Sequence, residues 1–154
     1  MRTIVYLLIF SILLVFGCSQ QEDAAEKPQA RQETPVIVPQ EVAESWKAVK
    51  VVAIDMTSGK EQMFIVDVGG EFIVPQSDLA VKVRHFLPSF VRDGKVISSS
   101  SNKLDNPAIM IRVTEKGQEI FNGWLFGLYP EAHNFRHDRF TFQLAGQIPA
   151  QKKG

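Results

Sequence analysis

The sequence predicts an all-β domain, a small antiparallel β-sandwich or barrel of about seven to eight short strands. Short runs rich in β-branched and aromatic residues recur after the first third of the chain, and such runs are typical of strands. Gly-, Asn- and Pro-containing turn signals separate them about every ten residues. No window carries an apolar stripe with the 3.6-residue period of an amphipathic helix.

The first 17 residues are predicted to be a signal peptide rather than part of the fold. Arg2 precedes an almost wholly apolar run over residues 4–16. A helix of that length rises about 20 Å, short of the roughly 30 Å hydrocarbon core of a bilayer. Residues 15–18, Val-Phe-Gly-Cys, resemble a bacterial lipobox, whose cysteine is acylated. Cys18 is the one cysteine of the chain and the predicted lipidation site.

Residues 18–44 are predicted to be the lipidated cysteine and a disordered tether. They contain three prolines and carry six acids against two bases, and this composition buries too little apolar surface to become ordered. Residues 36–38, Val-Ile-Val, are the exception and fit an edge strand. The lipid anchor predicts membrane attachment in the bacterial cell envelope, facing the periplasm. Ser19, where an Asp would indicate inner-membrane retention, favours the outer membrane over the inner.

The β domain is predicted to span residues 45–149, with a tail over 150–154. Two strands over 46–56 and 63–68 are expected to form a hairpin around a Gly-containing turn, and a short strand follows before Pro75. Residues 79–87 alternate between apolar and polar, which places His85 in register with the apolar face. Further strands are expected over residues 95–100, 108–114, 119–126 and 140–144.

The segment from Gly123 to Phe140 is the most distinctive part of the chain because it combines aromatic residues with two of the three histidines. Most of its aromatics are expected in the core, since each buries about 150–250 Å². The alternative is a partly exposed docking surface, because Trp, Tyr and Arg are favoured interface anchors. That candidate binding surface consists of Trp124, Tyr129, His133, Arg136, His137 and Arg139.

His133 and His137 are also weak candidates for a metal site. On a helical turn beginning at Pro130 they would share one face, and His-x3-His is half of a familiar zinc site. A third ligand would have to come from His85, Asp138 or Glu131, and nothing in the sequence brings one near. Structural imidazoles bonded to backbone or carboxylate are the preferred interpretation, so no metal or other cofactor is predicted.

Catalysis and nucleic-acid binding are not predicted. The serines at 98–101 lack a Gly-x-Ser-x-Gly turn and a paired base, and Gly69-Gly70 is not followed by a helix that would cradle a phosphate. Because no nucleophile, base and stabiliser converge, an enzyme is not expected. The 17 Lys and Arg balance 17 Asp and Glu, which leaves no basic footprint for nucleic acid.

The domain also resembles a known family. Four short motifs carry the resemblance: Asn106-Pro107-Ala108, Gly123-Trp124-Leu125-Phe126, Pro130, and His137-Asp138-Arg139-Phe140. Together they resemble the DUF2155 family of small exported bacterial proteins of uncharacterised function. The chain departs from the family in carrying Gly127-Leu128-Tyr129 where other members have small residues. The resemblance implies export and points to Trp124, Phe126, Pro130 and His137, but it brings no activity.

The sequence therefore predicts a lipid-anchored cell-envelope protein that serves in binding or assembly, with an envelope protein as its partner. The alternative is a metal-binding envelope protein that uses His133 and His137.

Overall fold

The computed structural model describes residues 33–151. The predicted signal peptide, Cys18 and most of the predicted tether lie outside the described residues, as do the last three residues of the tail.

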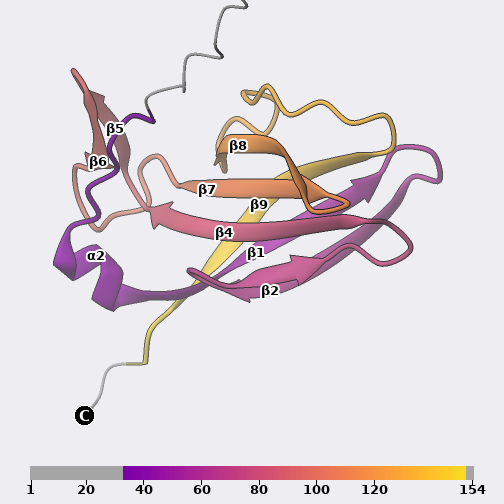
Figure 1. The fold of residues 1–154 in the computed structure, drawn as a ribbon. Helices are drawn as coiled ribbons and strands as arrows, with labels where there is room; N and C mark the ends of the chain where they lie inside the picture. The colour runs from indigo at the N-terminus through magenta and orange to yellow at the C-terminus, as the bar shows by residue number, and fades with distance from the viewer. Residues whose placement is uncertain (1–32, 152–154) are drawn as a thin grey trace, which may run out of the picture. The chain divides into compact units, whose positions relative to one another are not determined.

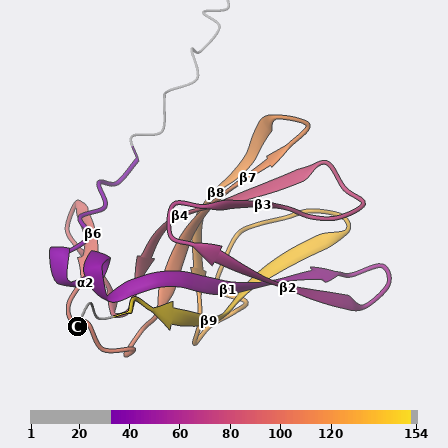
Figure 2. The ribbon, with the colours of Figure 1, turned by 90° about the horizontal axis from the view of Figure 1, so that it is seen from below.

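The described chain folds as a β-sandwich of two antiparallel sheets, which confirms the predicted class (Figures 1 and 2). Within the described residues the sheets do not close into a barrel. The three-stranded sheet has the order β2 (Lys60–Asp67), β1 (Trp46–Asp55) and β9 (Phe140–Pro149). The four-stranded sheet has the order β3 (Glu71–Ile73), β4 (Leu79–Leu87), β7 (Ala108–Glu115) and β8 (Gln118–Phe126). A separate ribbon consists of β5 (Phe90–Asp93) and β6 (Val96–Ser99).

The core lies between the two sheets, where the long strands point alternate residues inward except at their bulges. The apolar residues that alternate with polar ones in the sequence therefore lie on the buried face, because successive side chains of a strand point to opposite faces. Each fully buried aliphatic or aromatic side chain stabilises the fold by about 1.5–3 kcal/mol relative to an exposed one. Inward residues from both sheets include Val49, Val51, Val81, Val83, Ile109, Ile111, Phe121, Leu125 and Phe142.

Two strands differ from the prediction. β5 was not predicted, and β9 runs on to Pro149 instead of ending at Leu144. The extension is possible because Ala145 bulges out of the pairing between β9 and β1, where Val51 pairs with Leu144 and Lys50 pairs with Gly146. The structure therefore has nine strands in the described residues rather than seven or eight.

The prediction that His85 shares the apolar face of its strand was wrong. A β-bulge interrupts the pairing of β4 with β7 between Val83 and His85. Because a bulge inserts one extra residue and reverses the alternation beyond it, Phe86 takes the inward position and is 2% exposed. His85 consequently points away from the core of the sandwich.

Residues 33–45 form a strap on the domain, although the prediction assigned residues 33–44 to the tether. The strap pairs with β6 through a parallel bridge between Val36 and Ile97, as expected for an edge strand. It continues into α2 (Gln40–Ser45), which packs on the domain through Val42, 3% exposed. The strap thus belongs to the same compact unit as the strands. No helix within residues 33–151 is long and apolar enough to span a bilayer.

Candidate functional site

The structure divides the aromatics of the Gly123–Phe140 segment and its flanks into two groups. Phe135 and Phe140 are buried with Phe121 and Phe142, and the rings of Phe135 and Phe121 lie 5.3 Å apart between centroids. In contrast, Trp124 is only half-buried on the outward face of β8. The core interpretation therefore holds for the Phe residues named here, and part of the segment remains at the surface.

The surface part forms a groove beside β8, here called the aromatic groove. Its floor is a cluster in which the ring of Phe90 packs edge-on against Trp124 at 4.9 Å and against Phe126 at 5.1 Å. Trp124 and Phe126 share one face because they lie two residues apart on a strand, while Leu125 between them is buried. The groove has a volume of about 650 Å³ and is lined by Phe90, Arg92, Gly123, Trp124, Phe126, Glu131, Ala132, His133 and Asn134.

β8 is an edge strand of its sheet, and the aromatic groove runs along it. One side of β8 pairs with β7. On its other side the chain passes from residue 131 to 134, but among the described residues no backbone hydrogen bond joins this loop to β8. The groove therefore combines half-exposed aromatic rings with a strand edge that, among the described residues, no other strand and no backbone group of this loop pairs with.

The motif residues of the sequence build this groove. A Cβ on Gly123 would lie 2.7 Å from Cζ of Phe121, so only glycine leaves room for that ring beneath β8. Gly127 donates its N–H to the Pro107 carbonyl at 2.8 Å. The side-chain amide of Asn106 donates to the backbone carbonyl of Phe90 at 3.1 Å, and the backbone carbonyl of Asn106 accepts the Phe90 N–H at 2.9 Å. The Asn106-Pro107 pair thus fixes both Phe90 and the end of β8.

His133 lines the aromatic groove together with Trp124. Its Nδ1 is buried and has no hydrogen-bond partner among the described residues. Burial lowers the pKa of His133, Glu131 opposes this shift, and Arg136 adds to it. The imidazole is therefore neutral at neutral pH, and the groove keeps a polar but uncharged wall.

His137 lies outside the groove and holds the start of β9. Its Nδ1 accepts the backbone N–H of Arg139 at 3.1 Å and of Phe140 at 3.0 Å, while Nε2 lies 3.5 Å from the Glu115 carboxylate. Arg136 is exposed and donates to the Phe135 carbonyl at 2.9 Å. His137 and Arg136 therefore serve local structure and are not brought together with Trp124.

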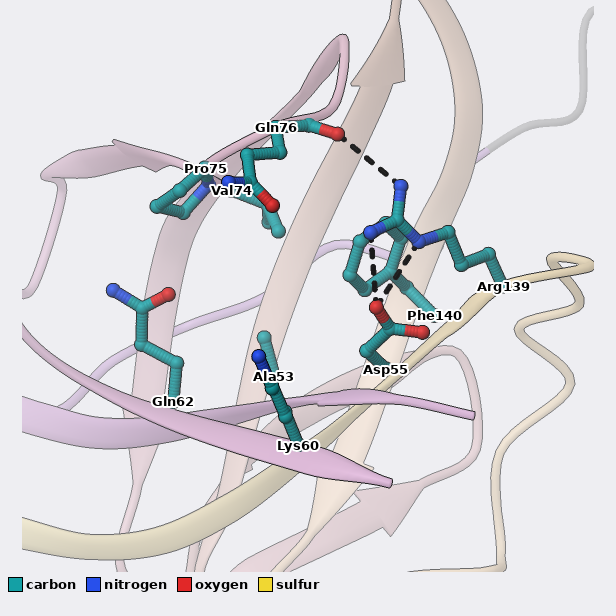
Figure 3. A pocket seen from close by; sticks show the side chains of 9 residues that line it. All are labelled: Ala53, Asp55, Lys60, Gln62, Val74, Pro75, Gln76, Arg139 and Phe140. Atoms are coloured by element: carbon teal, nitrogen blue, oxygen red, sulfur yellow. Dashed lines mark hydrogen bonds and ion pairs between the residues drawn. The ribbon is translucent and has the colours of Figure 1, made fainter. Parts of the chain in front are cut away.

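Arg139 lies in a separate hollow of about 210 Å³ at one end of the sandwich (Figure 3). Its Nη2 and Nε donate to Oδ2 of Asp55 at 2.9 and 3.1 Å, and Nη1 donates to the Gln76 carbonyl at 3.2 Å. The guanidinium also lies 4.7 Å from the centroid of the Phe140 ring. Chiefly because of the Arg139 hydrogen bond, the pKa of Asp55 is lowered to about 2. Arg139 thus ties β1 to the turn after β3 as part of the framework.

His133 and His137, the weak candidates for a metal site, do not share one face of a helical turn. Residues 130–137 form a turn and an extended loop, not a helical turn, because Phe135 reaches inward to the rings of Phe121 and Phe142. Since Nδ1 of His137 accepts two backbone N–H groups, it offers no lone pair to a metal. Within residues 33–151 no group of three His, Cys, Asp or Glu side chains is arranged to hold a metal ion.

Of the six residues of the predicted binding surface, Trp124 and His133 lie in the aromatic groove. Tyr129 is 61% exposed in the loop that follows β8. Phe90 and Arg92 were missed because the short strand β5 carries no clear signal; only the Asn106-Pro107 motif marked this region indirectly.

Comparison with known proteins found no matching family model, no matching curated protein and no matching solved structure. Membership of the DUF2155 family therefore stays a prediction from the four motifs.

Proposed function

We propose that this protein is a lipid-anchored module of the bacterial cell envelope that binds an extended segment of a partner protein along β8. The observation that carries the proposal is the edge of β8, which no described strand pairs with, beside the half-exposed rings of Phe90, Trp124 and Phe126. Natural proteins usually cover or blunt exposed sheet edges, and an edge with adjacent side-chain pockets is the feature used in β-strand addition.

Each part of the groove has a role in this binding. The free backbone groups of β8 supply hydrogen bonds to the main chain of the partner, which are independent of its sequence. Every second side chain of the added strand then meets the rings of Trp124 and Phe126, which supply selectivity for apolar residues. Arg92, exposed on β5, and the neutral His133 provide a polar rim. No step of this function requires a nucleophile or a metal.

The anchoring half of the proposal rests on the lipobox-like residues 15–18. A single acyl chain gives only weak membrane binding, so a stable anchor needs more than one chain. Acylation of Cys18 would keep the domain at the membrane surface, where envelope proteins are its available partners. The motif resemblance supports export and assigns no partner.

The proposal is tested with a photo-crosslinking amino acid placed at Ala132 in the full chain, in growing cells. One partner should crosslink, and Trp124→Ala should lower its yield about tenfold or more, since truncating an anchoring Trp commonly costs about 2 kcal/mol or more. Ile65→Ala is the matched control, because Ile65 is an exposed apolar residue on the outer face of β2. A crosslink yield unchanged by Trp124→Ala, or lowered equally by Ile65→Ala, would refute binding in the groove.

A further inference from the structure

A third cavity is lined by residues of the strap and α2, of the start of β1 and of the end of β4. This cavity, here called the α2 pocket, has a volume of about 320 Å³. It is predominantly apolar, and two of its side chains carry titratable nitrogen atoms. The lining residues are Val38, Val42, Ala43, Trp46, Lys47, Val68, His85 and Phe86.

The walls of the α2 pocket are held by backbone hydrogen bonds to both sheets. The Val68 N–H donates to the Lys47 carbonyl at 2.9 Å, which fixes the wall on the side of β1. The next N–H, of Gly69, donates to the Val83 carbonyl of β4 at 2.8 Å. The pocket is therefore formed in advance, as most small-molecule sites are.

The cover of the pocket is the strap, which is attached at both ends. The Ile37 N–H donates to the Ile97 carbonyl at 2.8 Å. At the other end, Asn102 accepts the Trp46 indole N–H at 2.6 Å and donates to the Ser45 hydroxyl at 2.8 Å. Since the indole N–H is used, Trp46 presents only apolar surface to the cavity, and its ring packs edge-on against Phe86 at 5.4 Å.

Two polar side chains line this apolar space. After the bulge in β4, Phe86 is buried in the core, and both Phe86 and His85 line the pocket; bulges commonly re-aim side chains in this way. Neither ring nitrogen of His85 has a hydrogen-bond partner among the described residues, and Lys47 has no ion pair there. Burial, with a contribution from Arg84, lowers the pKa of His85, so it acts as a neutral N–H donor.

We propose that the α2 pocket binds a fatty acid, with the hydrocarbon chain in the apolar cavity and the carboxylate between Lys47 and His85. Apolar walls with one cation match a ligand that is mostly hydrocarbon and carries one negative charge. A sugar would leave its hydroxyl groups unpaired against Val38, Val42 and Val68, which is costly. A phosphate dianion would meet one cation where such sites usually provide several donors. The site is independent of the aromatic groove.

The test uses the full chain and dodecanoate carrying a diazirine near its methyl end, with the labelled peptides mapped by mass spectrometry. Label is expected on residues 38–47 and near Val68, and unlabelled dodecanoate should compete for it while dodecanol competes more weakly. Ala43→Phe, which fills the pocket from the exposed face of α2, should abolish labelling there. Label confined to residues 1–17 or spread over the surface would overturn the proposal, because it would indicate partition into apolar segments only.

Substitution of Lys47 tests the role assigned to its charge. Lys47→Met should weaken competition by dodecanoate about two- to fivefold, the range of a solvent-accessible ion pair, and should leave competition by dodecanol unchanged. Lys95→Met, in the exposed turn between β5 and β6, is the matched control and should change neither. If Lys47→Met weakened competition by dodecanoate and by dodecanol equally, the carboxylate contact would be refuted. Unaltered thermal unfolding of Ala43→Phe would establish that the effect of that substitution is local.

Discussion

Replacement of His137 by Ala removes one acceptor that serves two backbone N–H groups. Arg139 and Phe140 both donate to Nδ1 of this histidine, at 3.1 and 3.0 Å. The Phe140 residue is buried, so water does not readily replace the lost bond. Each such hydrogen bond contributes about 0.5–1.5 kcal/mol net, and we therefore expect His137→Ala to lower the free energy of unfolding by about 1–3 kcal/mol.

A second variant separates this role from a functional one. Asn carries an oxygen that can accept N–H groups two and three residues ahead, as in Asx turns. His137→Asn should therefore recover most of the stability lost in His137→Ala, in urea unfolding of the domain from Glu33 onward. Equal destabilisation in both variants would refute the capping argument and would leave the contacts of the imidazole with Phe135 and Glu115 as the stabilising ones.

Three further outcomes are expected. The pKa of Asp55 in the fold is about 2, below its ordinary 3.8. The Asp55–Arg139 pair therefore stabilises the fold fully above pH 3.8 and progressively less as pH falls toward 2. In unfolding curves across this range, the free energy of unfolding of Arg139→Met should depend less on pH than that of the unchanged protein. Gly123→Ala should lower the free energy of unfolding by about 1–3 kcal/mol, as overpacking does, because its Cβ would lie 2.7 Å from the Phe121 ring. Adding Phe121→Leu to the same chain should restore part of the lost stability. If the destabilisations of the two single variants simply added in the double variant, the clash would be contradicted. Cys18→Ser should move the protein out of the membrane fraction on cell fractionation, whereas retention there would show that acylation is not the anchor.

Much of the fold followed from local patterns. The apolar run along residues 108–114 and the alternation along residues 140–144 predict strands, and β7 and β9 carry these residues. Turn signals placed the hairpins β1–β2 and β7–β8 correctly, because a hairpin is defined by residues close together in the chain. Of the edge strand expected over residues 36–38, the structure has a single bridge between Val36 and Ile97.

What only the tertiary structure decided concerns contacts between distant segments. His85 left the apolar face because pairing with β7 inserts a bulge. The sequence assigned Trp124 and Phe126 to a common face, but Phe90, far away in the chain, converts that face into a groove. Pairing of the two histidines failed because burial of Phe135 prevents a helical turn over residues 130–137.

The sequence by itself thus determined most of the strands, the hairpin turns and the signal that predicts an anchor, since all of these depend on neighbouring residues. Which side chains of the Gly123–Phe140 segment meet, and which only support β9, depended on the packing of β5, β8 and the loop between β8 and β9. That packing is set by sheet order and register, which local periodicity does not encode.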